Sequence, residues 1–119
     1  GRGNGNGSSE TADKDEVTVQ ELKSILDQKG RKVTLIDVRE PEEYQIVNLP
    51  QAQLIPLGTI RERANELDTA DEIYVHCKMG GRSAKAVKIL KDFGFKKVKN
   101  VKGGIDAWAA EIDPSLPRY

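Results

Sequence analysis

The sequence predicts a single α/β domain, in which helices cover both faces of a parallel β-sheet. At 119 residues the chain has room for one domain with a modest core. Segments with the β-branched, apolar composition of buried strands alternate with segments of helical periodicity. Strands that alternate with helices in this way are typical of a parallel sheet covered on both faces.

The predicted elements begin with a capped helix. Thr18 and Glu21 form a capping-box signature, the apolar residues that follow recur at helical spacing, and Gly30 ends the helix. The next segments are predicted as a buried strand, a short helix, a short strand and a charged helix, at 32–38, 41–44, 53–57 and 59–67.

The second half of the chain repeats the alternation. A buried strand, an amphipathic helix, a short strand and a last helix are predicted at 72–77, 82–94, 96–101 and 103–112. In the amphipathic helix Ala84, Val87, Leu90 and Lys91 are predicted near the inner side, and Gly94 ends it.

Residues 1–14 differ from the rest, because they are rich in Gly, Asn and Ser and then charged. We predict that they form a disordered linker or tag, and that residues 15–119 form the folded domain.

The composition argues against several kinds of partner. Lys plus Arg equals Asp plus Glu at 19 each, so no bulk charge would attract nucleic acid or a membrane surface. No apolar run approaches a membrane span, and no signal-peptide pattern is present. The single cysteine cannot form an internal disulfide, and no Cys/His cluster has zinc-like spacing. We therefore expect a reducing, cytoplasmic setting and no metal or other cofactor.

Polar residues stand at the ends of two predicted strands. Asp37 and Arg39 lie at the end of one strand, and His76 and Cys77 end another. In parallel α/β sheets the ligand crevice lies at the carboxyl ends of the strands, so we predict the active site at this edge.

The segment CKMGGRS after the second of these strands has the composition of an anion-binding loop. Its backbone N–H groups are expected to point inward, and Gly80 and Gly81 allow positive φ and close approach. At the base of the loop, Cys77 is favoured as the thiolate by these groups and by the charges of Lys78 and Arg82. A nucleophilic Cys77 is therefore preferred to the alternative of a small core thiol.

Two chemistries use a cysteine in such a loop: phosphate-ester hydrolysis and sulfur transfer through a persulfide. The family pattern of Cys-based phosphatases has five residues between Cys and Arg, whereas four separate Cys77 from Arg82. A tighter ring of amides suits a terminal sulfur, and no aspartate is marked out as a general acid. The count favours sulfur transfer, with a Cys-dependent phosphatase or arsenate reductase-like enzyme as the alternative.

Four segments resemble a single-domain rhodanese, a thiosulfate sulfurtransferase-like module. In the family's order they are LIDVREPEEY, NLPQAQLIPL, VHCKMGGRSA and VKGGIDAW, and they span about Glu16 to Trp108. The family usually has G-H-I-P-G-A where this chain has VNLPQA, so Asn48 and Gln51 replace the common His and Gly at the rim of the site.

The resemblance implies a rhodanese-like domain over residues 15–119 that carries sulfane sulfur as a persulfide on Cys77. The donor would be thiosulfate or a cysteine desulfurase, and the acceptor a thiophile such as cyanide. The other residues that it implies at the substrate site or in the loop are Lys78, Met79, Gly80, Gly81, Arg82, Ser83, Arg39 and Asp37. A non-catalytic rhodanese-like binding module is a further alternative, although such members usually lack the cysteine.

Several of these residues also have a structural interpretation. Arg82 would orient the sulfonate or pair with a surface carboxylate, and Lys78 would bind the donor or remain solvated. In the family the Asp fixes the loop and the Arg helps to bind anions, but Asp37 and Arg39 could equally pair with each other. His76 is predicted as structural, because strand alternation points it away from Cys77.

The segment WAAEIDPSLPRY resembles the terminus of rhodanese domains fused behind an adenylyltransferase of the MoeB/ThiF-like, molybdopterin-synthase sulfurylase type. This resemblance implies a fused or partner adenylyltransferase domain. It also implies a ubiquitin-like sulfur-carrier protein as the acceptor, in molybdopterin, thiamine or tRNA thiolation. Any second thiol would have to come from outside this chain, which has one cysteine.

Overall fold

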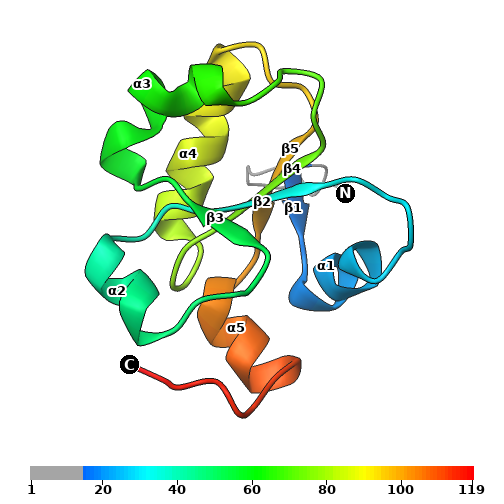
Figure 1. Cartoon of the computed structure of the whole chain (residues 1–119), viewed down its shortest axis with the longest axis vertical. Coiled ribbons are helices and arrows are strands. Elements are labelled where there is room, and N and C mark those ends of the chain that lie inside the picture. Colours follow the sequence, from blue (N-terminus) through cyan, green and yellow to red (C-terminus); the bar gives the residue numbers. More distant parts are fainter. Residues whose placement is uncertain (1–14) are drawn as a thin grey trace, which may run out of the picture.

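The computed structural model describes residues 15–119, and the predicted linker or tag at 1–14 lies outside the described residues. One five-stranded sheet has the order β1-β5-β4-β2-β3, and every pair of neighbouring strands is parallel. The strands are β1 Glu16–Val17, β2 Thr34–Asp37, β3 Ala52–Leu54, β4 Ile73–His76 and β5 Val98–Val101. The predicted parallel α/β sheet is confirmed (Figure 1).

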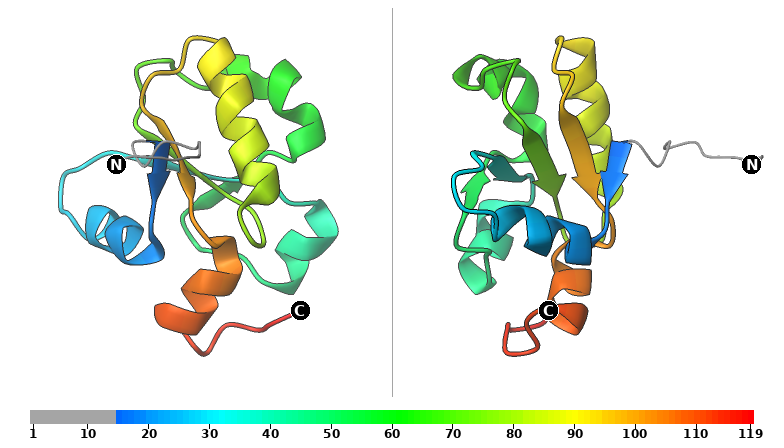
Figure 2. Two further views of the ribbon diagram at one scale, coloured as in Figure 1. Left: turned by 180° about the vertical axis from the view of Figure 1, so that it is seen from behind. Right: turned by 90° about the vertical axis from the view of Figure 1, so that its right-hand side faces the viewer.

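Helices lie on both faces of the sheet. They are α1 Val19–Leu26, α2 Pro41–Ile46, α3 Ile60–Arg63, α4 Gly81–Asp92 and α5 Gly104–Glu111, with 3₁₀ turns η3 Leu57–Thr59 and η4 Ala64–Glu66. Figure 1 shows α3 and α4 on one side of the strands, and α1 and α5 on the other. After α5 the chain runs back beneath α2, as the red segment in both views of Figure 2 shows. No helix within 15–119 has the length and apolar character that a membrane crossing requires.

Strand alternation divides the core into two layers. On β4, Ile73 and Val75 pack in the cluster that contains Leu90 of α4, whereas Tyr74 packs in the cluster that contains Leu22 of α1. Since successive side chains of a strand point to opposite faces, His76 at the end of β4 and Cys77 after it are directed to different layers. The residue that follows β4, Cys77, belongs to the α4 layer.

Several predicted elements differ from the structure in their bounds. The first helix ends at Leu26 with Asp27 as its C-cap, so Gly30 lies in the turn after the helix and does not end it. The two-residue edge strand β1 was not predicted, because it is too short to show a strand pattern. The charged helix predicted at 59–67 is a short α-helix between two 3₁₀ turns, which hydrophobic spacing does not distinguish from one continuous helix. The predicted strand 53–57 ends at Leu54, since Pro56 has no N–H to donate and a 3₁₀ turn follows.

The inner side of α4 is also corrected. Its buried residues are Ser83, Ala86, Val87 and Leu90, whereas the predicted Ala84 and Lys91 are partly exposed. The buried stripe therefore begins with a polar residue, which brings the Ser83 hydroxyl under the loop that precedes the helix.

Register brings the polar strand ends together. Asp37 of β2 lies opposite His76 of β4 in the parallel ladder. The backbone continues this pairing beyond β2, because Val38 donates to the His76 carbonyl at 3.0 Å. The predicted meeting of the two strand ends at one edge is confirmed.

Candidate active site

The Cys77 thiol lies at the base of a tight loop between β4 and α4. Cys77 as a whole is only 1% exposed. Helix α4 begins at Gly81, one residue earlier than predicted, and Gly80 is its N-cap with φ +114°. Positive φ is therefore needed at Gly80 alone, since Gly81 does not have it. The loop closes on the cysteine as the sequence predicted.

Polar hydrogens surround the sulfur. The Gly80 amide donates to Cys77 Sγ at 3.0 Å, and Ser83 Oγ lies 3.3 Å from the same atom. Burial raises the pKa of the Cys77 thiol, but the hydrogen bonds from the Ser83 hydroxyl and the loop amides lower it by more. The net pKa is below the ordinary value, which makes the thiolate more available near neutral pH.

Asn100 of β5 holds the loop from behind. Its side-chain carbonyl accepts a hydrogen bond from the Ser83 hydroxyl, and its amide Nδ2 donates to the Gly80 carbonyl at 3.3 Å. Asn100 is buried, at 3% exposure. Sequence reasoning did not identify it, although an uncharged polar residue beside Val101 at the end of a predicted buried strand was a usable signal.

The outer side of the loop is fixed by α5. The Ile105 amide donates to the Cys77 carbonyl at 2.9 Å, and the Asp106 amide donates to the Lys78 carbonyl at 3.0 Å. A Cβ at Gly104, which has φ +60°, would lie 2.5 Å from each of these two carbonyl oxygens. The Gly80 amide thus turns toward the sulfur, while the carbonyls of Cys77 and Lys78 turn toward the N-terminus of α5.

A hollow of about 400 Å³ leads to the cysteine. Its lining consists of Cys77, Lys78, Met79, Gly81, Arg82 and Lys85. Met79 is 69% exposed, at the open side of this hollow. Lys85, from the second turn of α4, was not predicted as part of the site.

Each of the two predicted cations of the loop has a carboxylate partner. Arg82 Nη1 and Nη2 donate to Glu43 Oε1 and Oε2 at 2.6 and 3.0 Å. Lys78 Nζ donates to Asp106 at 3.0 Å. The hydrogen bonds from Arg82 are the main cause that lowers the pKa of Glu43 to about 2. Arg82 therefore forms an ion pair with a carboxylate, which was the structural alternative for this residue.

Asp37 and Arg39 form a fully buried ion pair. Arg39 Nη2 lies 2.7 Å from Asp37 Oδ2, and the Asp37 side chain also accepts the Arg39 amide at 3.0 Å. The guanidinium further donates to the Val47 carbonyl at 2.7 Å and to the Tyr119 hydroxyl at 2.8 Å. Arg39 does not line the hollow at Cys77. Both residues thus stand beneath α2 and support the wall of the site.

His76 belongs to the opposite layer from Cys77, as predicted. Its Nδ1 lies 3.2 Å from the Cys77 carbonyl oxygen, which can only accept, so Nδ1 carries the proton. Its Nε2 lies 3.8 Å from Asp37 Oδ2. Burial lowers the pKa of His76, so the ring is neutral near pH 7. These contacts support a structural role.

Sequence reasoning missed the groups that pair with the loop. Glu43 and Asp106 lie within the segments that carried the resemblance, but their partners are far away in the chain. Tyr119 was noted only as the last letter of a motif, and its hydroxyl reaches both Arg39 and Glu43. Among residues 15–119, no group of three or more His, Cys, Asp or Glu side chains could hold a metal ion.

Comparison with known proteins identifies relatives of the whole folded domain. The family model described as a rhodanese-like domain matches residues 18–111. An adenylyltransferase and sulfurtransferase MOCS3 from Arabidopsis thaliana is 35% identical over 87% of this chain and 25% of its own length. A probable adenylyltransferase/sulfurtransferase MoeZ from Mycobacterium tuberculosis is 41% identical over 87% of this chain and 26% of its own length. The chain spans about a quarter of these two relatives.

A solved structure agrees with this result. The rhodanese-like domain protein from Staphylococcus aureus superposes with a TM-score of 0.75, at 36% identity, and covers 87% of this chain and 97% of its own. The names of the relatives support a role in sulfur transfer. From its sequence, its sheet and its cysteine loop, the chain belongs to the rhodanese-like domain family.

Proposed function

We propose that this domain is a sulfurtransferase that carries a sulfane sulfur as a persulfide on Cys77. The observation that carries the proposal is the buried thiol, which accepts a hydrogen bond from the Gly80 amide at 3.0 Å and has a lowered pKa. A thiolate is the nucleophile in this chemistry, and the loop favours it at neutral pH. The names of the sulfurtransferase relatives support the same reaction class.

With thiosulfate as donor, the Cys77 thiolate attacks the outer sulfur. A new sulfur–sulfur bond forms at Cys77, the bond to the sulfonate breaks, and sulfite leaves with the electron pair. With a desulfurase persulfide as donor, the attack is the same and the donor thiolate leaves. The loop amides that lower the pKa of the thiol are placed to stabilise the terminal sulfur of the Cys77 persulfide, as an oxyanion hole stabilises developing charge.

In the second half-reaction the persulfide gives its outer sulfur to an acceptor. Cyanide attacks that sulfur, thiocyanate leaves, and the Cys77 thiolate is restored. We propose a ubiquitin-like sulfur carrier with an adenylated C-terminus as the acceptor, and an adenylyltransferase domain, fused or separate, as the activating partner. The terminal sulfur of the persulfide attacks the acyl carbon, AMP leaves, and a thiol from outside this chain reduces the resulting acyl disulfide to the thiocarboxylate and free Cys77. The two adenylyltransferase/sulfurtransferase relatives support this assignment. A reducing cytoplasm would keep Cys77 as a free thiol.

The decisive experiment is an intact-mass measurement after incubation with thiosulfate, beside Cys77→Ala. A species heavier by one sulfur, absent from the variant and discharged by cyanide, is the expected result. A parallel assay with an aryl phosphate tests the phosphatase alternative. Release of phosphate without any sulfur adduct would overturn the proposal, and so would the absence of an adduct with both thiosulfate and a persulfide-loaded desulfurase.

A further inference from the structure

We propose that Glu43 selects among sulfur donors by holding Arg82, so that Cys77 accepts donors of low charge in preference to free dianions such as thiosulfate. This inference rests on the proposed sulfur transfer and names the class of donor that suits it. A persulfide carried by a protein or a thiol brings one negative charge at most to the reacting sulfurs, whereas thiosulfate brings two.

The Glu43 carboxylate is fixed from three sides. It binds both terminal nitrogens of Arg82, at 2.6 and 3.0 Å. Its Oε1 also accepts the Glu40 amide at 3.0 Å, which completes the capping box at the start of α2. Its Oε2 accepts the Tyr119 hydroxyl at 2.7 Å. Because the Glu43 carboxylate also completes this helix cap, it cannot easily move away from Arg82 when a second anion approaches.

Tyr119 anchors this arrangement to the interior. Its hydroxyl accepts from the buried Arg39 guanidinium at 2.8 Å while it donates to Glu43. Its ring also lies under the Lys78 ammonium, with 4.8 Å from Nζ to the ring centroid. One side chain therefore links the buried ion pair to both of the loop cations and keeps the wall of the hollow in one arrangement.

The charges around the hollow leave little attraction for a dianion. Of the cations that line it, Lys78 is paired with Asp106 and Arg82 is paired with Glu43. Lys85 is the remaining cation of the lining, and it makes no ion pair within the described part of the chain. A sulfonate that approaches Arg82 must displace Glu43 or tolerate its charge, and the repulsion from Glu43 rises with the charge of the donor.

The test uses two donors of similar shape that differ by one charge: thiosulfate and methanethiosulfonate. In both, Cys77 attacks the outer sulfur, and the leaving group is sulfite or methanesulfinate. Glu43→Gln keeps an acceptor for the Glu40 amide but removes the charge. We expect KM to fall about tenfold for thiosulfate and about threefold for methanethiosulfonate, because the Coulomb energy scales with the product of the charges.

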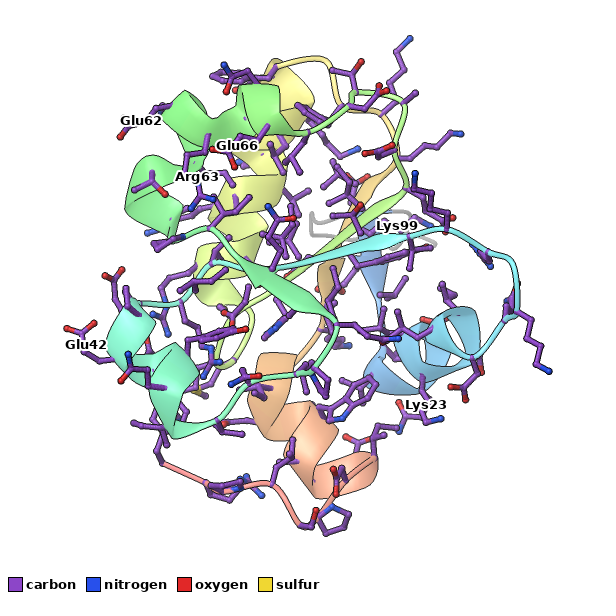
Figure 3. The ribbon with its side chains drawn as sticks, viewed as in Figure 1. Lys23, Glu42, Glu62, Arg63, Glu66 and Lys99 are labelled. Carbon is purple, nitrogen blue, oxygen red and sulfur yellow. The ribbon has the colours of Figure 1, made fainter. Side chains whose placement is uncertain are left out.

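Glu42→Gln is the matched control. It removes the same charge from the same helix, but Glu42 is exposed and points outward from α2 in Figure 3. We expect KM for both donors to match that of the unchanged protein. Tyr119→Phe, which keeps the ring and removes one hydrogen bond from Glu43, should lower KM for thiosulfate by less than Glu43→Gln does.

Three outcomes separate this inference from the proposed function. A fall in KM that is larger for the dianion, with thermal unfolding unchanged, supports it. A persulfide that forms on Cys77 while Glu43→Gln leaves KM equal or higher overturns the role of Glu43 and leaves sulfur transfer standing. If neither donor nor a persulfide-loaded desulfurase adds sulfur to Cys77, both conclusions are wrong.

Discussion

The Ser83 hydroxyl lies between two acceptors, Cys77 Sγ at 3.3 Å and the side-chain carbonyl of Asn100. One hydroxyl proton is thus shared between the Cys77 sulfur and a buried amide of the neighbouring strand. When Cys77 is a thiolate, the sulfur is the stronger acceptor, and the hydroxyl can turn toward it. The direction in which the Ser83 hydroxyl points therefore depends on the charge of Cys77, and it determines whether Asn100 keeps its hydrogen bond.

The first prediction is that Ser83→Ala raises the pKa of Cys77. Loss of a hydrogen bond to a charged group is worth about 1.4 kcal/mol, which corresponds to about one pH unit. The measurement is the pH dependence of Cys77 alkylation by iodoacetamide. Ser115→Ala is the control, because this exposed hydroxyl bonds to Asp113, away from the loop. An unchanged midpoint in Ser83→Ala would show that the amides alone set the thiol pKa.

A second prediction concerns the contact between the loop and α5. Gly104→Ala should lower the free energy of unfolding by at least about 2 kcal/mol, because the new Cβ would overlap two backbone oxygens at a positive φ. Gly58→Ala is the control, since nothing lies within 4 Å of a Cβ there. Denaturant titration of both variants measures the difference. Equal stability would mean that α5 shifts freely relative to the loop.

The third prediction compares a buried and a partly exposed arginine. Arg39→Ala leaves Asp37 as an unpaired buried charge, which should cost about 3–5 kcal/mol. Arg63, labelled with Glu66 in Figure 3, is by comparison only partly buried; Arg63→Ala removes its ion pair with Glu66 and a 3.3 Å hydrogen bond to the Leu54 carbonyl, and should cost about 1 kcal/mol. Chemical denaturation tests both. Similar losses of unfolding free energy in the two variants would show that Arg39 contributes no more to stability than Arg63 does.

The fourth prediction is a pH dependence that originates from His76. Its pKa is lowered in the folded protein, so below about pH 6.5 the unfolded chain takes up a proton that the folded chain does not. Stability should therefore fall as pH falls from 7.5 to 5.5, because of this group. The measurement is denaturation of the protein and of His76→Asn at both pH values.

This window lies above the range in which carboxylates such as Glu43 titrate, since the pKa of Glu43 is about 2. The Asp37 and Arg39 side chains that face the ring oppose each other in sign. If the variant loses as much stability on acidification as the unchanged protein, His76 is not the source of the dependence.

Local patterns in the sequence predicted the fold and the position of Cys77 in it well. The Thr18–Glu21 capping box is present with both of its hydrogen bonds. The β-branched composition of the segment around Ile73 identified a buried strand, and its end placed Cys77 at the ligand edge of the sheet. These features depend on residues that are close together in the chain, so they can be recognised from the sequence.

Contacts between distant segments could not be predicted from local sequence patterns. Arg82 and Glu43 are 39 residues apart, and Ser83 and Asn100 are 17 apart. Whether an arginine of an anion-binding loop is free or paired depends on the position of α2 above the loop, which no spacing within either segment records. The ion pair between Arg82 and Glu43 therefore depends on tertiary structure, and local sequence patterns could not predict it.

The amides and carbonyls of the Cys77 loop face opposite ways, the first toward the sulfur and the second toward α5. The peptide dipoles of the loop are consequently aligned before any sulfur arrives. Adding or removing a charged sulfur atom at Cys77 would then require little reorganisation of the protein. If Cys77 carries a persulfide as proposed, loading and unloading the sulfur would leave the loop in one arrangement.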